Sequence, residues 1–243
     1  MRPAVIAHRG ASFDFAEHTY EAYLAAVEAG ADGFECDVRL TADDQLVCWH
    51  DSDLARTSNG SGRISKMTWS ELSKVNAGSW HHAGRDAKPL LFSDLLELAM
   101  TKGKTLSIET KHPVRTGGRI EHLLAQTLRP YLPMSSASPA QASFRMMSFS
   151  RQAVKRWQKL VPGVPTVFLV EKKHVLEIAA PVVGPGIHLI REDPTLVTRM
   201  HDKGREVHVW TVDAIEDIEL CMKLGVDAII TNKPAEVLAA IGH

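Results

Sequence analysis

The sequence predicts an α/β fold, an irregular (β/α)8 TIM barrel with a small insertion after the third strand. Three observations support this prediction. Short apolar runs alternate with helical patterns from end to end, which is typical of a mainly parallel sheet. The 243 residues are a normal length for one barrel. Hydrophobic residues make up 44% of the chain, enough for one large core. We therefore expect a single domain over residues 1–243.

Nine apolar runs are candidate strands, one more than an eight-stranded barrel needs. They are residues 4–8, 33–39, 46–50, 105–111, 145–149, 165–170, 186–190, 206–212 and 227–231. The link at 41–45 is too short for the crossover helix that parallel strands require, so we expect the barrel to be irregular there. The run at 186–190 is the other weak point. At least one run is therefore wrong or lies outside the barrel.

Helical spacing and end signals predict the helices. Thr19 is a plausible N-cap for the first helix, and Gly30 ends it. A second helix runs from about residue 93 to Gly103, and another begins near residue 213 and stops at Gly225. Further helices are expected over residues 119–128, 150–160 and 194–203.

Residues 52–89 interrupt the alternation and form the expected insertion. Within it, residues 57–62 are typical of a loop, and residues 68–72 begin a short helix. Insertions at the carboxyl ends of barrel strands cover the active site. We therefore expect this segment to form one wall of the pocket, with a functionally neutral excursion as the alternative.

Charged side chains stand at strand positions where apolar residues would be expected. Because successive side chains of a strand point to opposite faces, Glu35, Asp37 and Arg39 share one face. Burying such a group requires compensation, which a divalent metal and a phosphate would supply. Other runs end in further residues of this kind: His8, Arg9, His50, Glu109 and Lys111.

This set of side chains suits the hydrolysis of a phosphate ester. Carboxylates hold a hard cation, basic side chains neutralise a phosphate, and two histidines can exchange protons near neutral pH. Each residue alone has a structural explanation: Glu35 and Asp37 could pair with Arg39, and His8 or Trp210 could simply be packed. The functional interpretation is favoured because all of them fall at one predicted barrel mouth.

Composition narrows the range of partners and locations. A net charge of −1 and a pI near 6.9 give no reason to expect nucleic-acid binding or attraction to anionic membranes. Stable membrane insertion is not expected, since no segment approaches the roughly 20 apolar residues that span a bilayer. Three cysteines without metal-site spacing indicate reduced thiols. With no signal-peptide-like start, we expect a cytoplasmic protein.

An ordered set of motifs resembles the glycerophosphodiester phosphodiesterase family. The motifs are His8-Arg9-Gly10, Glu17-His18-Thr19, Glu35-Cys36-Asp37, His50-Asp51, residues 54–62, Glu109-Thr110-Lys111, Trp210-Thr211-Val212-Asp213 and Thr231-Asn232-Lys233-Pro234. They extend over the whole chain. The resemblance implies a (β/α)8 barrel that hydrolyses small-molecule glycerophosphodiesters to sn-glycerol 3-phosphate and an alcohol. It also implies a divalent cation, Mg²⁺ or Ca²⁺, with Mn²⁺ as a further candidate.

The resemblance also implies roles for individual residues. Glu35, Asp37 and Glu109 correspond to metal ligands, His8 and His50 to the acid–base pair, Arg9 and Lys111 to phosphate-binding residues, and Trp210 to an apolar wall for the glycerol. Two residues depart from the family pattern: His18 replaces the usual asparagine, and Asn232 replaces the usual acidic residue. These changes bear on substrate preference and metal affinity.

Several alternatives remain open from the sequence. One is a lysophospholipase D-like hydrolase of longer lipids, which would need an exposed apolar rim on the insertion, from Met67, Trp69, Leu72 and Trp80. Another is a phosphate- or polyol-binding barrel without catalysis. The sequence does not assign acid and base to the two histidines. Nor does it distinguish water from the glycerol 2-hydroxyl as nucleophile, or fix the oligomeric state. We expect broad tolerance of the leaving alcohol.

Overall fold

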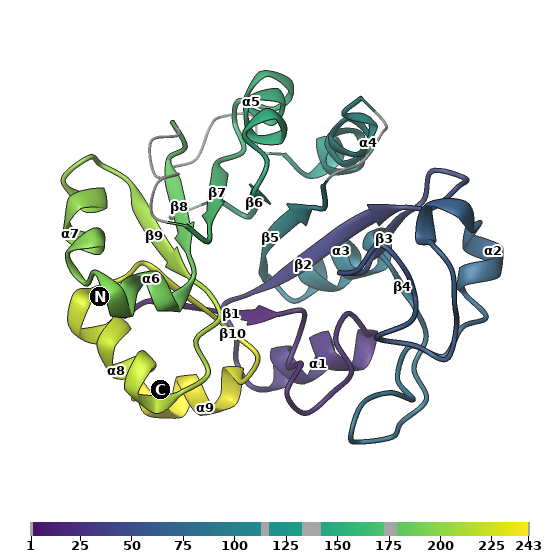
Figure 1. Cartoon of the computed structure of the whole chain (residues 1–243), viewed down its shortest axis with the longest axis horizontal. Coiled ribbons are helices and arrows are strands. Elements are labelled where there is room, and N and C mark those ends of the chain that lie inside the picture. Colours follow the sequence, from purple (N-terminus) through teal and green to yellow (C-terminus); the bar gives the residue numbers. More distant parts are fainter. Residues whose placement is uncertain (1, 113–116, 133–141, 173–178, 243) are drawn as a thin grey trace.

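A computed structural model describes residues 2–112, 117–132, 142–172 and 179–242. Within these residues, eight parallel strands pair in a closed ring, because β1 pairs with both β10 and β2. The ring consists of β1 (Ala4–His8), β2 (Gly33–Leu40), β5 (Thr105–Thr110), β6 (Phe144–Ser148), β7 (Thr166–Val170), β8 (Val182–Pro185), β9 (Glu206–Val209) and β10 (Ala228–Thr231). Helices surround the strands (Figure 1). The predicted barrel is confirmed.

Two further strands lie outside the ring. β3 (Leu46–Cys48) is antiparallel to β2, and β4 (Leu90–Leu91) is antiparallel to β3. The run at 46–50 is therefore a strand but not part of the barrel wall, because the short link at 41–45 permits only an antiparallel return. His50 follows the end of β3 instead of lying within the strand.

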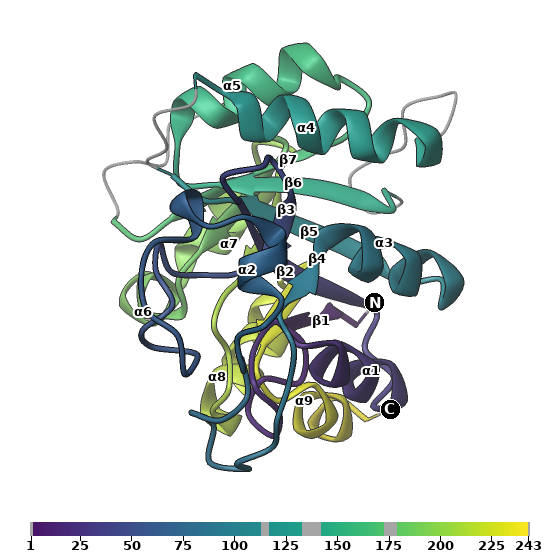
Figure 2. The same ribbon diagram turned by 90° about the vertical axis from the view of Figure 1, so that its right-hand side faces the viewer.

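The segment between β3 and β4 forms the insertion. It contains a 3₁₀ turn (Ile64–Lys66) and α2 (Trp69–Leu72). Figure 2 shows α2 and its loops on the left, away from the two chain ends on the right. The segment and β3 share a small core of buried side chains, Val47, Trp49, Leu54, Ile64, Leu72 and Ala77.

Most predicted helices are confirmed. The helices around the barrel are α1 (Tyr20–Glu28), α3 (Phe92–Thr101), α4 (Arg119–Leu128), α5 (Arg151–Leu160), α6 (Ile187–Glu192), α7 (Thr195–His201), α8 (Ile215–Leu224) and α9 (Pro234–Ala240). The Thr19 hydroxyl caps α1 by accepting from the Ala22 amide. Gly30 and Gly225 adopt positive φ after α1 and α8, as expected at helix ends.

One strand prediction is wrong. Residues 186–190 begin α6, and the strand lies just before them as β8. The mistake arose because a short apolar run does not by itself separate a strand from a buried helix; Leu189 and Ile190 are buried on the helix. Helix α9 was not predicted, although Pro234 at its first position is a typical start signal.

Apolar side chains fill both the barrel and the layer around it. Two large clusters lie mainly between strands and helices, and a smaller one inside the barrel includes Ile6, Met147, Leu169 and Ile230. Met147 of this inner cluster is level with Glu109 in the strand register, so the cluster reaches the depth of the polar side chains. Among the described residues, no helix has the length and apolar character that a membrane crossing requires.

Candidate active site

A cavity of about 320 Å³ opens at the carboxyl ends of the barrel strands. One part of its lining is polar and comes from β1, β2, β5 and the end of β3; the other part is mostly apolar and comes from β6, β7, β9 and β10. The lining residues are His8, Arg9, Glu35, His50, Glu109, Lys111, Met147, Phe149, Leu169, Glu171, Trp210, Thr211 and Ile230. Seven of the eight sequence-predicted site residues line it, and the eighth, Asp37, lies directly behind.

Three carboxylates meet beneath the polar part of the cavity. Strand register places Glu109 beside Asp37, and the alternation of β2 puts Glu35 on the same inward face. One oxygen of each lies within 4.8 Å of the others. Glu35 Oε2 is buried without a hydrogen-bond partner, and the buried Asp37 Oδ1 has only an ion pair with Lys111. Such a set of hard oxygen donors fits Mg²⁺, Ca²⁺ or Mn²⁺.

The three carboxylates have different proton affinities. Burial, followed by the charge of Asp37, raises the pKa of Glu35 well above its usual value and that of Glu109 to about 8. The pKa of Asp37 is lowered: burial opposes this, but Arg9 and Lys111 outweigh it. A cation binding here would therefore compete with protons on the two glutamates.

Two basic side chains lie among the carboxylates. Arg9 Nε is 3.1 Å from Asp37 Oδ2, and Lys111 Nζ is 3.2 Å from Asp37 Oδ1 and 3.0 Å from Glu109 Oε1. Two positive charges thus face three carboxylates. A divalent cation would turn this part of the cavity from negative to positive, as the binding of a phosphodiester requires.

His8 is held by an amide. Its Nδ1 lies 2.7 Å from Asn232 Oδ1, while Asn232 Nδ2 donates to Asp213 Oδ2 over 2.6 Å and the Asn232 backbone N–H donates to Asp213 Oδ1. Because the Asp213 carboxylate only accepts, the amide oxygen must face His8, and His8 Nδ1 carries the proton. Burial and then Arg9 lower the pKa of His8 to about 3. His8 Nε2 is left as an acceptor.

His50 is held by a carboxylate. Its Nδ1 donates to Asp51 Oδ1 over 2.7 Å, and Asp51 Oδ2 accepts from Arg56 Nε over 2.5 Å. Arg39 does not pair with the carboxylates of β2; it donates to the backbone carbonyl of His50 instead. Burial lowers the pKa of His50, although Asp37 and Asp51 oppose the shift.

Arg56 links the partner of His50 to the partner of Arg9. Besides binding Asp51, it makes a two-pronged contact with Glu17, through Nη1 over 3.0 Å and Nη2 over 2.7 Å. Glu17 Oε1 also accepts from Arg9 Nη1 over 3.0 Å. No role for Arg56 or Glu17 individually is predicted from the sequence, because only the folded chain brings residues 17 and 56 together.

His18, the residue that departs from the family pattern, is buried behind the site. Its Nε2 lies 2.9 Å from Asp37 Oδ2, and its Nδ1 lies 2.9 Å from the Tyr23 hydroxyl. His18 does not line the cavity. It therefore supports a carboxylate from the side opposite the substrate.

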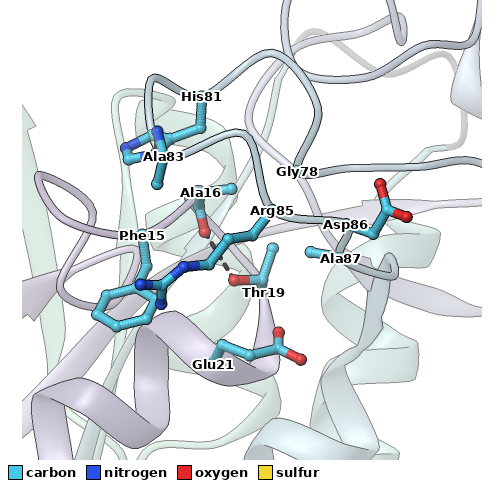
Figure 3. Close-up of a pocket in the computed structure, with 10 residues that line it drawn as sticks. All are labelled: Phe15, Ala16, Thr19, Glu21, Gly78, His81, Ala83, Arg85, Asp86 and Ala87. Carbon is cyan, nitrogen blue, oxygen red and sulfur yellow. Dashed lines mark hydrogen bonds between the residues drawn. The ribbon is translucent and has the colours of Figure 1, made fainter.

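The prediction that the insertion walls the catalytic pocket is wrong. None of residues 52–89 lines the cavity. The insertion instead borders a separate pocket of about 70 Å³ in front of α1, where Arg85 lies over the Phe15 ring, 5.2 Å from its centre (Figure 3). The short β4 and the small core of the insertion hold the segment to the side of the barrel.

Phe149 and Glu171 were also missed. Each directly follows a barrel strand, β6 or β7. Carboxyl ends of parallel strands meet at one edge, and this rule could have identified both. Phe149 packs edge to face on Trp210, with 5.5 Å between ring centres.

The chain is similar to proteins of one known family. The model of the glycerophosphoryl diester phosphodiesterase family matches residues 8–236. A Mycobacterium tuberculosis protein named probable glycerophosphodiester phosphodiesterase 1 is 40% identical, over 98% of this chain and 92% of that protein. A glycerophosphodiester phosphodiesterase of Caldanaerobacter subterraneus is 33% identical, over 98% of this chain and 97% of that protein. An Oleispira antarctica phosphodiesterase, solved with its product sn-glycerol-3-phosphate, shares the fold with a TM-score of 0.88 at 23% identity, over 99% and 97% of the two chains.

Proposed function

Because this chain belongs to the glycerophosphoryl diester phosphodiesterase family, we propose that it is an enzyme that hydrolyses glycerophosphodiesters to sn-glycerol 3-phosphate and an alcohol. One observation carries the proposal beyond the family name. Three carboxylates, two basic side chains and two histidines converge on one cavity at the barrel mouth. A phosphodiester bound there would meet each group that its hydrolysis requires.

Glu35, Asp37 and Glu109 would hold a divalent cation, Mg²⁺, Ca²⁺ or Mn²⁺. When bound, the cation would polarise a non-bridging phosphoryl oxygen and favour attack at phosphorus. Arg9 and Lys111 would stabilise the negative charge that grows on the phosphoryl oxygens. Trp210, held by a 2.7 Å hydrogen bond from its Nε1 to the Gly184 carbonyl, would lie against the glycerol.

The supports of the two histidines favour different roles. His8 keeps an unprotonated Nε2 at the cavity and would take the proton of the attacking hydroxyl, whether water or the glycerol 2-hydroxyl. His50 is paired with the Asp51 carboxylate, which stabilises a protonated imidazole, and would give a proton to the leaving oxygen. We therefore assign His8 as the base and His50 as the acid.

The alternative functions have less support. Of the four residues that would form an apolar rim for a lipid, Leu72 is fully buried, and Met67 and Trp69 pack against the core of the insertion. Trp80 is the one member of this set among the exposed large apolar side chains. The non-catalytic alternative depended on His18 and Asn232, yet each keeps a hydrogen bond to a site residue. Three free, buried cysteines support a reducing compartment such as the cytoplasm.

Release of glycerol 3-phosphate from glycerophosphocholine tests the proposal. We expect release with Mg²⁺, Ca²⁺ or Mn²⁺, none after chelation, and recovery when metal is restored. Asp37→Asn removes one charge from the carboxylate set and should remain folded but inactive. Glu236→Gln, an exposed position on α9, is the control and should match the wild type. Release that persists unchanged in a chelator would refute the metal-dependent mechanism.

A further inference from the structure

The apolar part of the catalytic cavity contains one carboxylate, Glu171. Its side chain points to the barrel interior, because it is two residues beyond Leu169, which also lines the cavity. Among the described side chains of this part, the others are apolar except for the Thr211 hydroxyl. A carboxylate here is unlike the deeper ones, because it stands apart from the proposed metal site.

The contacts of Glu171 leave its carboxylate available. Its backbone carbonyl is held by His188, whose Nε2 lies 3.1 Å away. No described residue forms an ion pair or a side-chain hydrogen bond with its carboxylate, and the residue is exposed. By contrast, Glu109 is bound by Lys111. The fold therefore fixes the backbone of Glu171 and leaves its oxygens free to accept.

Strand register places Glu171 close to the proposed glycerol wall. The Gly186 amide donates to the carbonyl of Val170, the residue before Glu171, and Gly186 in turn bridges to Trp210. Glu171 and Trp210 both line the cavity, and Gly186 connects the two strand ends that carry them. Any side chain at Gly186 would collide with the His188 ring, since an added Cβ would lie 2.6 Å from it.

From this arrangement we propose that Glu171 selects the free hydroxyls of the glycerol and excludes acylated glycerol; this inference rests on the proposed function. A molecule lying on Trp210 with its phosphate at Arg9 and Lys111 would present its far hydroxyl to Glu171. A carboxylate only accepts, so it recognises a hydroxyl donor. An acyl ester at that hydroxyl removes the donor and brings an apolar chain against the carboxylate.

The substrate class follows from this selection. The enzyme should prefer glycerophosphodiesters whose far hydroxyl is free, so its preferred substrate comes from reactions that hydrolyse the acyl ester at that position of a glycerophospholipid. Because Glu171 is exposed, part of its interaction is shared with water. We therefore expect selectivity of about tenfold, not the far larger ratios of fully buried hydroxyl sites.

Three substrates separate recognition of the far glycerol hydroxyl from recognition of the leaving alcohol. They are glycerophosphocholine, glycerophosphoglycerol and 1-hexanoyl-glycerophosphocholine, which stays soluble because its acyl chain is short. The wild type should favour glycerophosphocholine over the hexanoyl ester in kcat/KM. Glu171→Leu should narrow that ratio about tenfold, with equal losses for glycerophosphocholine and glycerophosphoglycerol. Glu171→Gln keeps an acceptor oxygen and should fall between the two.

The control is Glu219→Gln, which removes the same charge from an exposed position on α8 and should leave every ratio unchanged. An unchanged ratio in Glu171→Leu overturns the proposal while the phosphodiesterase activity stands. A loss confined to glycerophosphocholine also overturns it, because the carboxylate would then contact the cationic alcohol. A wild type inactive on every substrate overturns this proposal and the proposed function together.

Discussion

His8 and His50 line one cavity, but they are supported in different ways. His8 follows a barrel strand and is held by the neutral Asn232 amide, which Asp213 orients. His50 follows a strand outside the barrel and is held by the Asp51 carboxylate. A carboxylate stabilises a protonated imidazole, whereas an amide oxygen does so only weakly. Burial lowers the pKa of both imidazoles, and the hydrogen-bond partner of each opposes that shift. The difference teaches that the charge of a histidine depends on its burial and its partner together.

Removing either imidazole should have the largest effect, and the leaving group should tell the two apart. His8→Ala and His50→Ala should each lower kcat by about 10²- to 10⁴-fold on glycerophosphocholine. A 4-nitrophenyl ester of glycerol 3-phosphate needs no proton on its leaving oxygen. On that ester, His50→Ala should recover most of its activity and His8→Ala should not. Steady-state kinetics with both esters measures this.

The same experiment can break the comparison. If the nitrophenyl ester restores both variants equally, the two histidines do not divide the roles as proposed. If it restores only His8→Ala, the acid and the base are exchanged. Binding of glycerol 3-phosphate by both variants is the control, since loss of a proton carrier should leave ligand binding largely intact.

Arg56 reaches the support of His50 but not that of His8, so its removal should affect the two histidines unequally. Arg56→Ala should lower kcat/KM about 10- to 100-fold, because His50 and Arg9 would both lose their alignment. Arg56→Lys should recover only part, since a lysine cannot make the two-pronged contact with Glu17. On the nitrophenyl ester, Arg56→Ala should recover the part of its lost activity that is due to the misalignment of His50.

Arg63→Ala is the matched control for Arg56, because Arg63 is an exposed arginine of the same insertion. We expect it to behave as the wild type. Equal losses in the two arginine variants would mean that Arg56 acts through the general stability of the insertion. Thermal unfolding of both variants distinguishes these cases.

A smaller effect on activity is expected when His8 is given a carboxylate partner like that of His50. Asn232→Asp gives His8 a carboxylate partner, which raises the pKa of His8 from about 3. A base with a raised pKa is protonated, and lost, at a higher pH. Burial and Arg9 keep His8 neutral in the wild type, so its kcat/KM should show no His8 limb between pH 4 and 8. With saturating metal, Asn232→Asp should bring an acid limb into this range. The absence of such a limb would mean that the partner of Nδ1 has little influence on the charge of His8.

Much of this site was predictable because parallel strands deliver their carboxyl ends to one edge. Glu35, Asp37 and Glu109 could be grouped from strand alternation and strand order alone. The family motifs added His8 and His50. The hydrogen-bond partners of the two histidines could not be predicted from strand order or motifs. A hydrogen bond such as that between Asn232 and His8 depends on side-chain geometry that no local pattern encodes.

Two features that differ from the sequence predictions have a common physical cause. Residues 186–190 form an apolar run, and such a run fits either a strand or the buried side of a helix. An insertion that follows a barrel strand usually covers the cavity, but β3 is antiparallel and directs this insertion sideways. In both cases tertiary packing decided between two locally acceptable conformations.

A third histidine, His18, extends the comparison of His8 with His50. Its conservative replacement should have the smallest effect on activity. His18 touches Asp37 from behind and does not reach the cavity, so it should carry no proton in the reaction. His18→Asn keeps an N–H donor, and asparagine tolerates the positive φ of 61° at this position. We therefore expect kcat and metal affinity to change less than about threefold.

His18→Gly is the informative partner of that variant, because it removes the donor and tolerates the positive φ at this position. Asp37 would lose one hydrogen bond, and the metal dissociation constant, measured by calorimetry with Mn²⁺, should rise about tenfold or more. Because His18 only positions Asp37, saturating metal should restore kcat in His18→Gly, whereas no metal concentration should restore His50→Ala on glycerophosphocholine. A kcat that stays low at saturating metal would mean that His18 takes part in the proton transfers. His18 could then no longer be distinguished from His8 and His50 as a residue that only positions Asp37.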